Sequence, residues 1–159
     1  MDFKIRKSNK QDYEDLCELY RQSDLMHHQA LSEMFEKPLS PPRDKEYLFT
    51  FMEDKDSSIF VAEYKEKVIG LIAFKLLHSK DIPILKKRTY LKINEIVVDE
   101  QYRGNGIGKT LMKEAHNWAI DKGINEIELN VFKFNQNAIE FYRDLGYEVR
   151  NLTMTKKLN

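Results

Sequence analysis

The sequence predicts an α/β domain built on a mixed, largely antiparallel sheet. Three observations lead to this fold class. Residues 91–123 combine a β-branched apolar run, three glycines within five residues and apolar residues at helical spacing. Residues 59–64 and 67–77 are apolar runs separated by the polar pair Lys65–Glu66, which predicts a hairpin. Residues 126–132 alternate apolar and polar side chains, as a half-buried strand does.

The N-terminal third is expected to contain one short strand and three helices. Residues 3–5 alternate as a strand does. Ser8, with Gln11 three residues later, matches a capping box and would open a helix that continues to about residue 21. Helical spacing predicts a second helix over 24–35 and, after a loop that three prolines enforce, a short helix near 44–52.

The C-terminal part is expected to alternate helices and strands. Gly123 should end the helix that the glycine-rich turn opens, and Gly146 should close a helix over 135–145. Residues 148–158 are expected to add one or two last strands, which brings the sheet to about six to seven strands with flanking helices. No change of composition marks a linker, so we expect a single domain over residues 1–159.

Charge and cysteine content exclude several classes of protein. Lys plus Arg equals Asp plus Glu, 26 each, so no overall field attracts nucleic acid or an anionic membrane, and we expect neither partner. Cys17 is the one cysteine, which excludes an intrachain disulfide and a cysteine-based zinc site and indicates a buried thiol. Because no apolar run has membrane-spanning length and no signal-peptide pattern is present, a cytoplasmic location is expected.

The glycine-rich turn reads QYRGNGIGK over residues 101–109 and is suited to a phosphate. Such a turn at a helix start presents free backbone N–H groups and the positive end of the helix dipole. A Walker A loop would need glycine in place of Arg103, and a dinucleotide fingerprint would need it in place of Lys109, so neither pattern fits. A glycine turn without a ligand is the alternative.

Two motifs in the second half of the chain fit a different family. Gln101, Gly104 and Gly106 match Q/R-x-x-G-x-G/A, and residues 135–147 (NQNAIEFYRDLGY) meet every fixed position of N-x-x-A-x-x-[LF]-Y-x-x-x-G-[FY]. The chain therefore resembles the GNAT superfamily of N-acetyltransferases, whose coenzyme A loop is the first motif. The resemblance covers almost the whole chain and is strongest from about Tyr90 onward. It implies the GNAT fold and acetyl-CoA as co-substrate. From the histidine spacing, no metal is expected.

The resemblance also implies where the coenzyme binds. Strands 91–98 and 126–132 would separate at a bulge and hold the pantetheine arm, whose amides would pair with the first strand. Amides of the glycine turn would hold the pyrophosphate; whether Arg103 and Lys109 add charge stays open. Asn135 would bind the pantetheine, cap its helix, or both. The implied coenzyme-binding set is Ile96, Val97, Val98, Arg103, Gly104, Asn105, Gly106, Ile107, Gly108, Lys109, Asn135 and Tyr142.

In this family a neutral amine usually attacks the thioester directly. The resemblance implies that an N–H near Val97 stabilises the oxyanion and that Tyr142 protonates the departing thiolate. Glu95, in an otherwise apolar strand, is the best candidate for the base, acting directly or through water. Some relatives carry a glutamate at the position of Asn130, which cannot accept a proton, so a structural or substrate-binding role for Glu95 stays open.

The acceptor region, about residues 24–47, is the part that the sequence defines least. His27 and His28 could bind substrate, act as base or lie at the surface, and the histidine spacing does not predict a metal site. Four acidic residues hint at a small cationic amine such as a polyamine or an aminoglycoside: Glu33, Glu36, Asp44 and Glu46.

The leading prediction is an acetyl-CoA-dependent N-acetyltransferase that acts on a primary amine of a small molecule. A protein or peptide acetyltransferase, acting on an N-terminal or lysine amine, is the enzymatic alternative. A non-catalytic acyl-CoA-binding regulatory module is the alternative from another class. Homodimerisation is common among relatives and is a possible assembly here.

Overall fold

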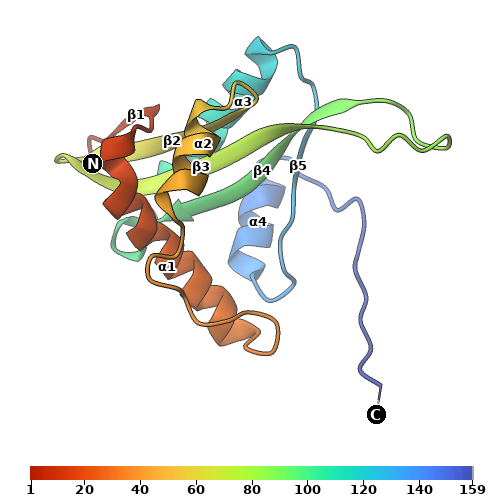
Figure 1. The fold of residues 1–159 in the computed structure, drawn as a ribbon, viewed down its shortest axis with the longest axis horizontal. Helices are drawn as coiled ribbons and strands as arrows, with labels where there is room; N and C mark the ends of the chain where they lie inside the picture. The colour runs from red at the N-terminus through yellow and green to blue at the C-terminus, as the bar shows by residue number, and fades with distance from the viewer. Residues whose placement is uncertain (159) are drawn as a thin grey trace. The chain divides into compact units, whose positions relative to one another are not determined.

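The computed structural model describes residues 1–158, which form two compact units, residues 1–129 and the residues from 130 onward. The larger unit contains a sheet of five strands in the order β1-β2-β3-β4-β5 (Figure 1). Neighbours from β1 to β4 are antiparallel, and β5 is parallel to β4. The predicted α/β class and the mixed, mostly antiparallel sheet are confirmed, with fewer strands than expected.

The strands are β1 (Lys4–Lys7), β2 (Ser57–Tyr64), β3 (Lys67–His78), β4 (Thr89–Val98) and β5 (Ile127–Leu129). The larger unit also holds α1 (Tyr13–Ala30), α2 (Lys45–Glu53), α3 (Ile107–Asp121) and the short 3-10 helices η1 (Lys10–Asp12) and η2 (Glu100–Tyr102), and the second unit holds α4 (Gln136–Asp144). The predicted hairpin is β2–β3, whose turn residues have φ angles of 49° and 64°.

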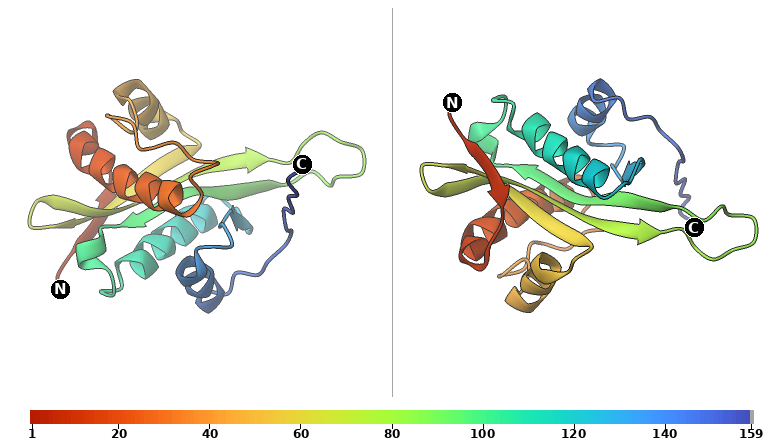
Figure 2. Two further views of the ribbon diagram at one scale, coloured as in Figure 1. Left: turned by 90° about the horizontal axis from the view of Figure 1, so that it is seen from below. Right: turned by 90° about the horizontal axis from the view of Figure 1, so that it is seen from above.

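In the larger unit, helices cover both faces of the sheet, with α1 and α2 on one face and α3 on the other (Figure 2). The first face buries a cluster that includes Leu16, Leu48 and Leu71, each fully shielded from solvent. The second face buries Phe74 under α3, whose Trp118 ring meets the Phe74 ring edge-on with centroids 5.1 Å apart. Burial of one such side chain stabilises the fold by about 2 kcal/mol, so both layers fix the sheet that carries the site.

One long helix, α1, replaces the two helices predicted over 8–21 and 24–35, so that prediction was wrong. No proline or glycine interrupts residues 21–25, and the hydroxyl of Ser23 bonds to Glu95 instead of capping a new helix. Asn9, and not Ser8, forms the capping box, in which Asp12 Oδ2 accepts the Asn9 N–H at 2.8 Å. Ser8 instead continues the sheet, since its N–H donates to the Ile59 carbonyl.

A β-bulge interrupts β4 at Asn94. Ala73 on β3 pairs with Glu95, whereas the next residue of β3 pairs with Ile93, so Asn94 is an extra residue in β4. The ladder between β4 and β5 ends at the pair Ile93–Leu129, next to this bulge. The strand predicted over 126–132 is therefore confirmed only for its first half, because pairing stops where the bulge turns β4.

The second unit is built on α4. The Asn135 side chain accepts the Ala138 N–H at 3.2 Å at the start of this helix, and Gly146 ends it with a φ of 88°. Both ends match the prediction of a capped helix closed by glycine. The strands predicted over residues 148–158 are absent from the described residues. This tail has strand-like alternation, but no neighbour in the sheet supplies the backbone hydrogen bonds that a strand requires.

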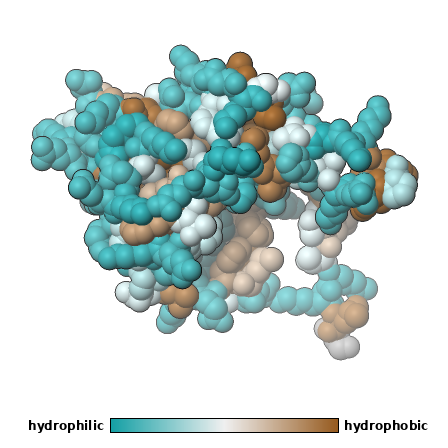
Figure 3. Space-filling model, turned by 45° about the horizontal axis from the view of Figure 1, so that its top comes forward, coloured by the Kyte–Doolittle hydropathy of each residue, from teal (hydrophilic) through white to brown (hydrophobic). Residues whose placement is uncertain are grey.

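The face shown in Figure 3 is mostly hydrophilic, with hydrophobic residues in separate patches. One of these patches lies at the tip of the loop between β3 and β4, where Ile82, Ile84 and Leu85 are exposed. Within residues 1–158, no helix has the length and apolar content needed to span a bilayer.

Replacing Gly70 by alanine tests how closely α3 packs on the sheet. A Cβ on Gly70 would lie 3.2 Å from the Ile107 Cγ2 atom and 3.3 Å from the Leu111 Cδ1 atom, both on α3. We expect Gly70→Ala to lower the free energy of unfolding by about 1–3 kcal/mol in urea denaturation. Lys113→Ala, on the exposed face of α3, should change it by less than about 0.5 kcal/mol. Equal stability of Gly70→Ala and the native chain would contradict this packing.

Candidate functional site

The glycine turn joins the end of β4 to the start of α3. Asp99 closes the strand: its N–H donates to the Ile69 carbonyl, and its carboxylate accepts the Gln101 N–H at 3.0 Å. Gly104 and Gly106 then take the left-handed conformation, with φ angles of 80° and 78°. Nothing lies within 4 Å of a Cβ built on either glycine. Backbone conformation therefore requires glycine here, and the space above the backbone is open to a ligand.

No cap or acidic side chain of the first turn neutralises the N-terminus of α3. Gly106 is the N-cap residue, no side chain caps the helix, and the first turn holds no acidic residue. The first N–H groups of a helix have no intrahelical acceptor, and they coincide with the positive end of the dipole. Ile107 is 1% exposed and anchors this end in the core. Gly108 has no positive φ, so the conformational reason for glycine does not extend to it.

Some polar side chains of the turn bond to nearby backbone carbonyls, and others are exposed to solvent. Arg103 donates from Nε to the Val98 carbonyl at 3.1 Å, which fixes the turn to the end of β4. Asn105 donates from Nδ2 to the Tyr102 carbonyl at 3.0 Å. Lys109 is exposed in the first turn of α3. Arg103 thus has a structural role, in addition to any positive charge that it supplies to a bound pyrophosphate.

Beyond the bulge, one edge of β4 is open within the larger unit. The Leu91 N–H donates to the Glu126 carbonyl on the β5 side, whereas the Asp99 N–H donates to β3. Because backbone groups alternate along a strand, Val97 directs its N–H towards β3, and Ile96 and Val98 direct theirs towards the other edge. No strand of the described residues pairs with that edge beyond Ile93. Ile96 and Val98, rather than Val97, therefore offer N–H groups there.

Glu95 is part of a polar cluster under the C-terminal half of α1. Its side chain lies on the α1 face of the sheet, because Glu95 is paired with Ala73 of that core cluster. The hydroxyl of Ser23, a residue only 7% exposed, donates to Glu95 Oε1 at 2.8 Å. Burial raises the pKa of the Glu95 carboxyl, while the Ser23 hydrogen bond and the charges of Arg43 and His27 oppose this rise. The result is a carboxyl shifted towards the range useful for a base.

Arg43 attaches the α1–α2 loop to the same helix. Its guanidinium forms two hydrogen bonds with the Asp24 carboxylate, at 2.8 and 3.0 Å, and lies 4.5 Å from the Tyr20 ring centroid. The Arg43 carbonyl accepts the Tyr13 hydroxyl at 2.8 Å. Burial raises the pKa of the Tyr20 phenol, and the Glu95 carboxylate adds to this rise, so Tyr20 stays neutral beside the cluster. Three kinds of contact thus hold this loop residue against α1, and the charge of Arg43 reaches Glu95.

The two histidines make local bonds at the end of α1. His27 Nδ1 donates to the Ser23 carbonyl at 2.8 Å, and His28 Nδ1 donates to the Phe35 carbonyl at 2.7 Å. The Phe35 ring packs against His27 with centroids 5.2 Å apart, which folds the loop back and explains why α1 ends at Ala30. His27 is close enough to Glu95 to affect its pKa. Among residues 1–158, no group of three metal-binding side chains occurs.

In the second unit, α4 carries the remaining residues predicted for the site. Asn135 uses Oδ1 to cap the helix, so its capping role is confirmed. The Tyr142 ring packs edge-on against the Tyr147 ring, with centroids 5.9 Å apart, and its carbonyl accepts the Tyr147 N–H. This turn fixes the orientation of the Tyr142 backbone.

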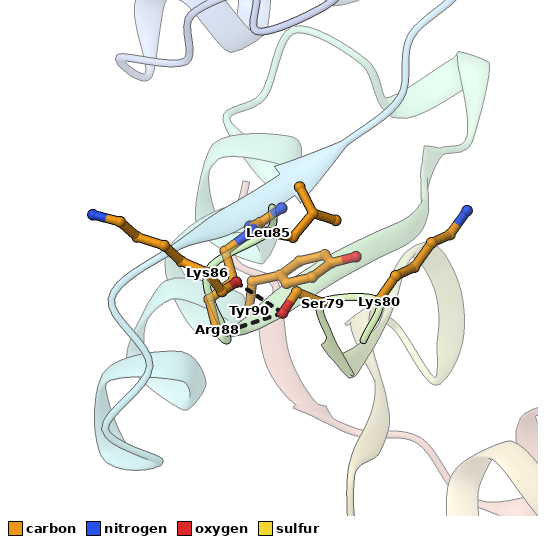
Figure 4. Close-up of a pocket in the computed structure, with 6 residues that line it drawn as sticks. All are labelled: Ser79, Lys80, Leu85, Lys86, Arg88 and Tyr90. Atoms are coloured by element: carbon orange, nitrogen blue, oxygen red, sulfur yellow. Dashed lines mark hydrogen bonds between the residues drawn. The ribbon is translucent and has the colours of Figure 1, made fainter. Parts of the chain in front are cut away.

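A separate shallow pocket lies at the base of the β3–β4 loop (Figure 4). Ser79 holds it together, since its hydroxyl donates to the Lys86 carbonyl and accepts the Arg88 N–H, both at 3.0 Å. Arg88 lies over the Tyr90 ring and pairs with Glu126 and Glu128, at 2.9 and 2.6 Å. Those two carboxylates neutralise the arginine, so the pocket is a weak candidate for an anion site.

Sequence reasoning identified Glu95 and the glycine turn but missed Ser23, Arg43 and Tyr20. Ser23 falls between the helix predicted to end at about residue 21 and the helix predicted to begin at residue 24. Had α1 been predicted as one helix, Tyr20, Ser23 and His27 would have fallen on one face at spacings of three and four residues. Arg43 offers no such signal, because its position depends on how a proline-rich loop folds.

Comparisons with known proteins identify the family. The family model described as Acetyltransferase (GNAT) family matches residues 23–147. An uncharacterised N-acetyltransferase of Methanocaldococcus jannaschii is 31% identical over 150 residues, covering 94% of this chain and 62% of the relative. Human N-acetyltransferase 8B is 30% identical over 99 residues, covering 62% of this chain and 42% of that protein. The chain therefore spans less than two thirds of the length of these relatives.

Solved structures share the fold over nearly the full chain. A tetramutant of the BH1408 protein from Bacillus halodurans superposes with a TM-score of 0.91 at 26% identity, covering 98% of this chain and 99% of that one. An aminoglycoside acetyltransferase from an uncultured soil metagenomic sample, in complex with sisomicin, has a TM-score of 0.70 at 22% identity, covering 99% and 97%. The chain belongs to the GNAT family of acetyltransferases.

Proposed function

We propose that the chain is an acetyl-CoA-dependent N-acetyltransferase that transfers the acetyl group to a primary amine of a small molecule by direct attack. The observation that carries this proposal is the open edge of β4, which leads from the bulge at Asn94 to the glycine turn of α3. An unpaired strand edge suits an amide-containing arm, and the helix start suits a pyrophosphate. The proposal includes the cytoplasmic location expected from the sequence.

The coenzyme would be held by groups of different kinds along this path. Ile96 and Val98 offer backbone groups to the pantetheine amides, and Gly104 and Gly106 leave room for close approach of phosphate. Val97 directs its N–H towards β3 and its side chain into the core cluster, so its proposed part is to shape the strand that carries the arm. The other predicted members are Arg103, Asn105, Ile107, Gly108, Lys109, Asn135 and Tyr142.

The amine must lose a proton before attack. A lysine-like amine with a pKa of about 10.4 is neutral in about one molecule in 2,500 at pH 7, and this deprotonation costs about 4.6 kcal/mol. Glu95 is proposed as the base because it is the carboxyl next to the bulge and burial raises its pKa. A carboxyl accepts protons only when ionised, so activity should rise with pH through the pKa of Glu95.

The leaving thiolate needs a proton or a positive group. Tyr142 is proposed as the acid because it occupies the tyrosine position of the second motif. A phenol with a pKa of about 10 protonates a thiolate with a pKa of about 8.5 only slightly uphill. The N–H of Ile96 or Val98 is proposed to stabilise the oxyanion, since the Val97 N–H is directed towards β3.

The proposed acceptor is a small cationic amine, and this proposal rests on residues of the α1–α2 region. The aminoglycoside enzyme that binds sisomicin shares the fold, and a small cationic amine fits the acidic residues of the α1–α2 region. One of these, Asp44, is already used as the N-cap of α2, where it accepts the Tyr47 N–H at 2.7 Å. The remaining hint comes from Glu33, Glu36 and Glu46.

A product screen tests the function. Acetyl-CoA is incubated with polyamines, aminoglycosides, amino acids and peptides with free N-terminal or lysine amines, and thiol release and acetylated product are measured by absorbance and mass spectrometry. Acetylation of a small amine supports the proposal. Preference for peptides would replace it with the protein-acetyltransferase alternative. Coenzyme binding without product from any amine would indicate a regulatory module.

Gly106→Glu tests the coenzyme site. We expect it to abolish acetyl-CoA binding in isothermal titration calorimetry, because a carboxylate would occupy the open space at the helix start. Gly123→Glu is the matched control: Gly123 follows the other end of α3 with a φ of 72° and open space at its Cβ position. It carries the same backbone strain and should retain affinity. Retained affinity in Gly106→Glu would remove the turn from the site.

Glu95→Gln tests the base. We expect kcat/KM to fall by about 10²–10⁴-fold and the acidic limb of its pH profile to disappear, with little change in acetyl-CoA affinity. Glu66→Gln, in the exposed β2–β3 turn, is the control and should leave the profile unchanged. A normal acidic limb in Glu95→Gln would show that another group, or water alone, accepts the proton.

Tyr142→Phe tests the acid. Removal of the hydroxyl should lower kcat while acetyl-CoA affinity stays within about twofold, since the ring and its packing against Tyr147 remain. Tyr90→Phe, whose ring lies under Arg88 at the base of the β3–β4 loop, serves as a control for removal of a phenol. Unchanged turnover in Tyr142→Phe would eliminate Tyr142 as the acid.

A further inference from the structure

We propose that Ser23 is a positioning residue that holds the Glu95 carboxylate, through its hydroxyl, in the orientation and ionisation state needed for proton transfer. The inference rests on the proposed role of Glu95 as base. Ser23 lies in the middle of α1, where a serine hydroxyl commonly bonds back to its own helix. Here it bonds across to β4 instead, at 2.8 Å from Glu95 Oε1.

The surroundings of Ser23 explain why the hydroxyl has this orientation. The residue is 7% exposed, so an unpaired hydroxyl would carry the full penalty of a buried polar group. Its carbonyl is occupied by His27 Nδ1 at 2.8 Å, which fixes the neighbouring turn of the helix. A hydrogen bond to an ionised carboxylate is stronger than one between neutral groups, so Glu95 is the preferred acceptor.

The hydroxyl opposes the effect of burial on Glu95. Burial alone favours the neutral carboxyl, which cannot act as a base. The titratable and charged groups that affect Glu95 are Asp24 and His27 on α1 and Arg43 on the α1–α2 loop, and Tyr20 also lies within its electrostatic reach. Asp24 raises the pKa of Glu95, whereas Arg43 and His27 lower it, and Arg43 is already paired with Asp24. Ser23 is therefore the donor that stabilises the carboxylate directly.

Ser23→Ala is the primary test. Its first readout is the pKa of the Glu95 carboxyl, measured by carbon NMR titration, and Glu95→Gln is used to assign the signal. Loss of a hydrogen bond to a charged group should raise the pKa of Glu95 by about one unit or more. Ser58→Ala is the matched control, because Ser58 is also buried but pairs with Phe74, on the opposite face of the sheet. It should not shift the pKa of Glu95. Ser23→Thr retains the hydroxyl and should restore the native value.

The pH profile of kcat/KM supplies the second readout. In Ser23→Ala the acidic limb should move to higher pH by the same interval as the NMR pKa. On that limb kcat/KM should be lower by about tenfold than in the native chain, and it should recover at higher pH. Thermal unfolding checks that the variant is folded. An unchanged pKa of Glu95 in Ser23→Ala would overturn the positioning role. A shifted pKa with an unmoved acidic limb would overturn it too, by removing Glu95 as the base, while product formation would still support acetyl transfer.

Discussion

The bulge at Asn94 shapes the part of the larger unit that carries the candidate site. It divides β4 into a part that pairs with β5, ending at Ile93, and a part with an open edge. One extra residue also changes which side chains face α1, and it places Glu95 in the same cross-strand row as Ala73. A single insertion in the ladder thus produces both the unpaired edge proposed for the coenzyme and the half-buried carboxyl proposed as base.

The polar cluster under α1 has an energetic consequence. A carboxyl placed against an apolar core would be neutral without partners, and an ionised one would be costly. The chain supplies a hydroxyl from Ser23 and positive charge from Arg43, which is itself paired with Asp24. These partners reduce the penalty without cancelling it, since the pKa of Glu95 remains raised. Partial compensation of this kind is expected for a base that must both lose and gain a proton near neutral pH.

The parts of the fold that could be predicted from the sequence are those in which local chemistry decides the structure. The turn at Lys65–Glu66, the N-cap at Asp44 and the glycine stops at Gly123 and Gly146 follow from backbone conformation and side-chain hydrogen bonds within a few residues. The bounds of α3 follow from glycine on one side and apolar spacing on the other.

The predictions that were wrong concern segments whose structure depends on contacts with residues distant in the sequence. The break predicted between residues 21 and 24 does not occur, and Ser23 there bonds to the distant Glu95. Residues 148–158 alternate like a strand but have no partner strand among the described residues. The end of β5 depends on a bulge in another strand. The same reason explains the site: the glycine turn is local and was predicted, whereas the Ser23–Arg43–Glu95 cluster joins a helix, a loop and a strand and could not be.

Amide hydrogen exchange, measured with and without saturating acetyl-CoA, tests the proposed coenzyme site residue by residue. If the coenzyme lies along β4 and the glycine turn, exchange should slow at Ile96, at Val98 and across residues 103–109, while α2 on the other face of the sheet stays unchanged. Binding without protection of these amides, or protection confined to another region, would contradict the proposed coenzyme site.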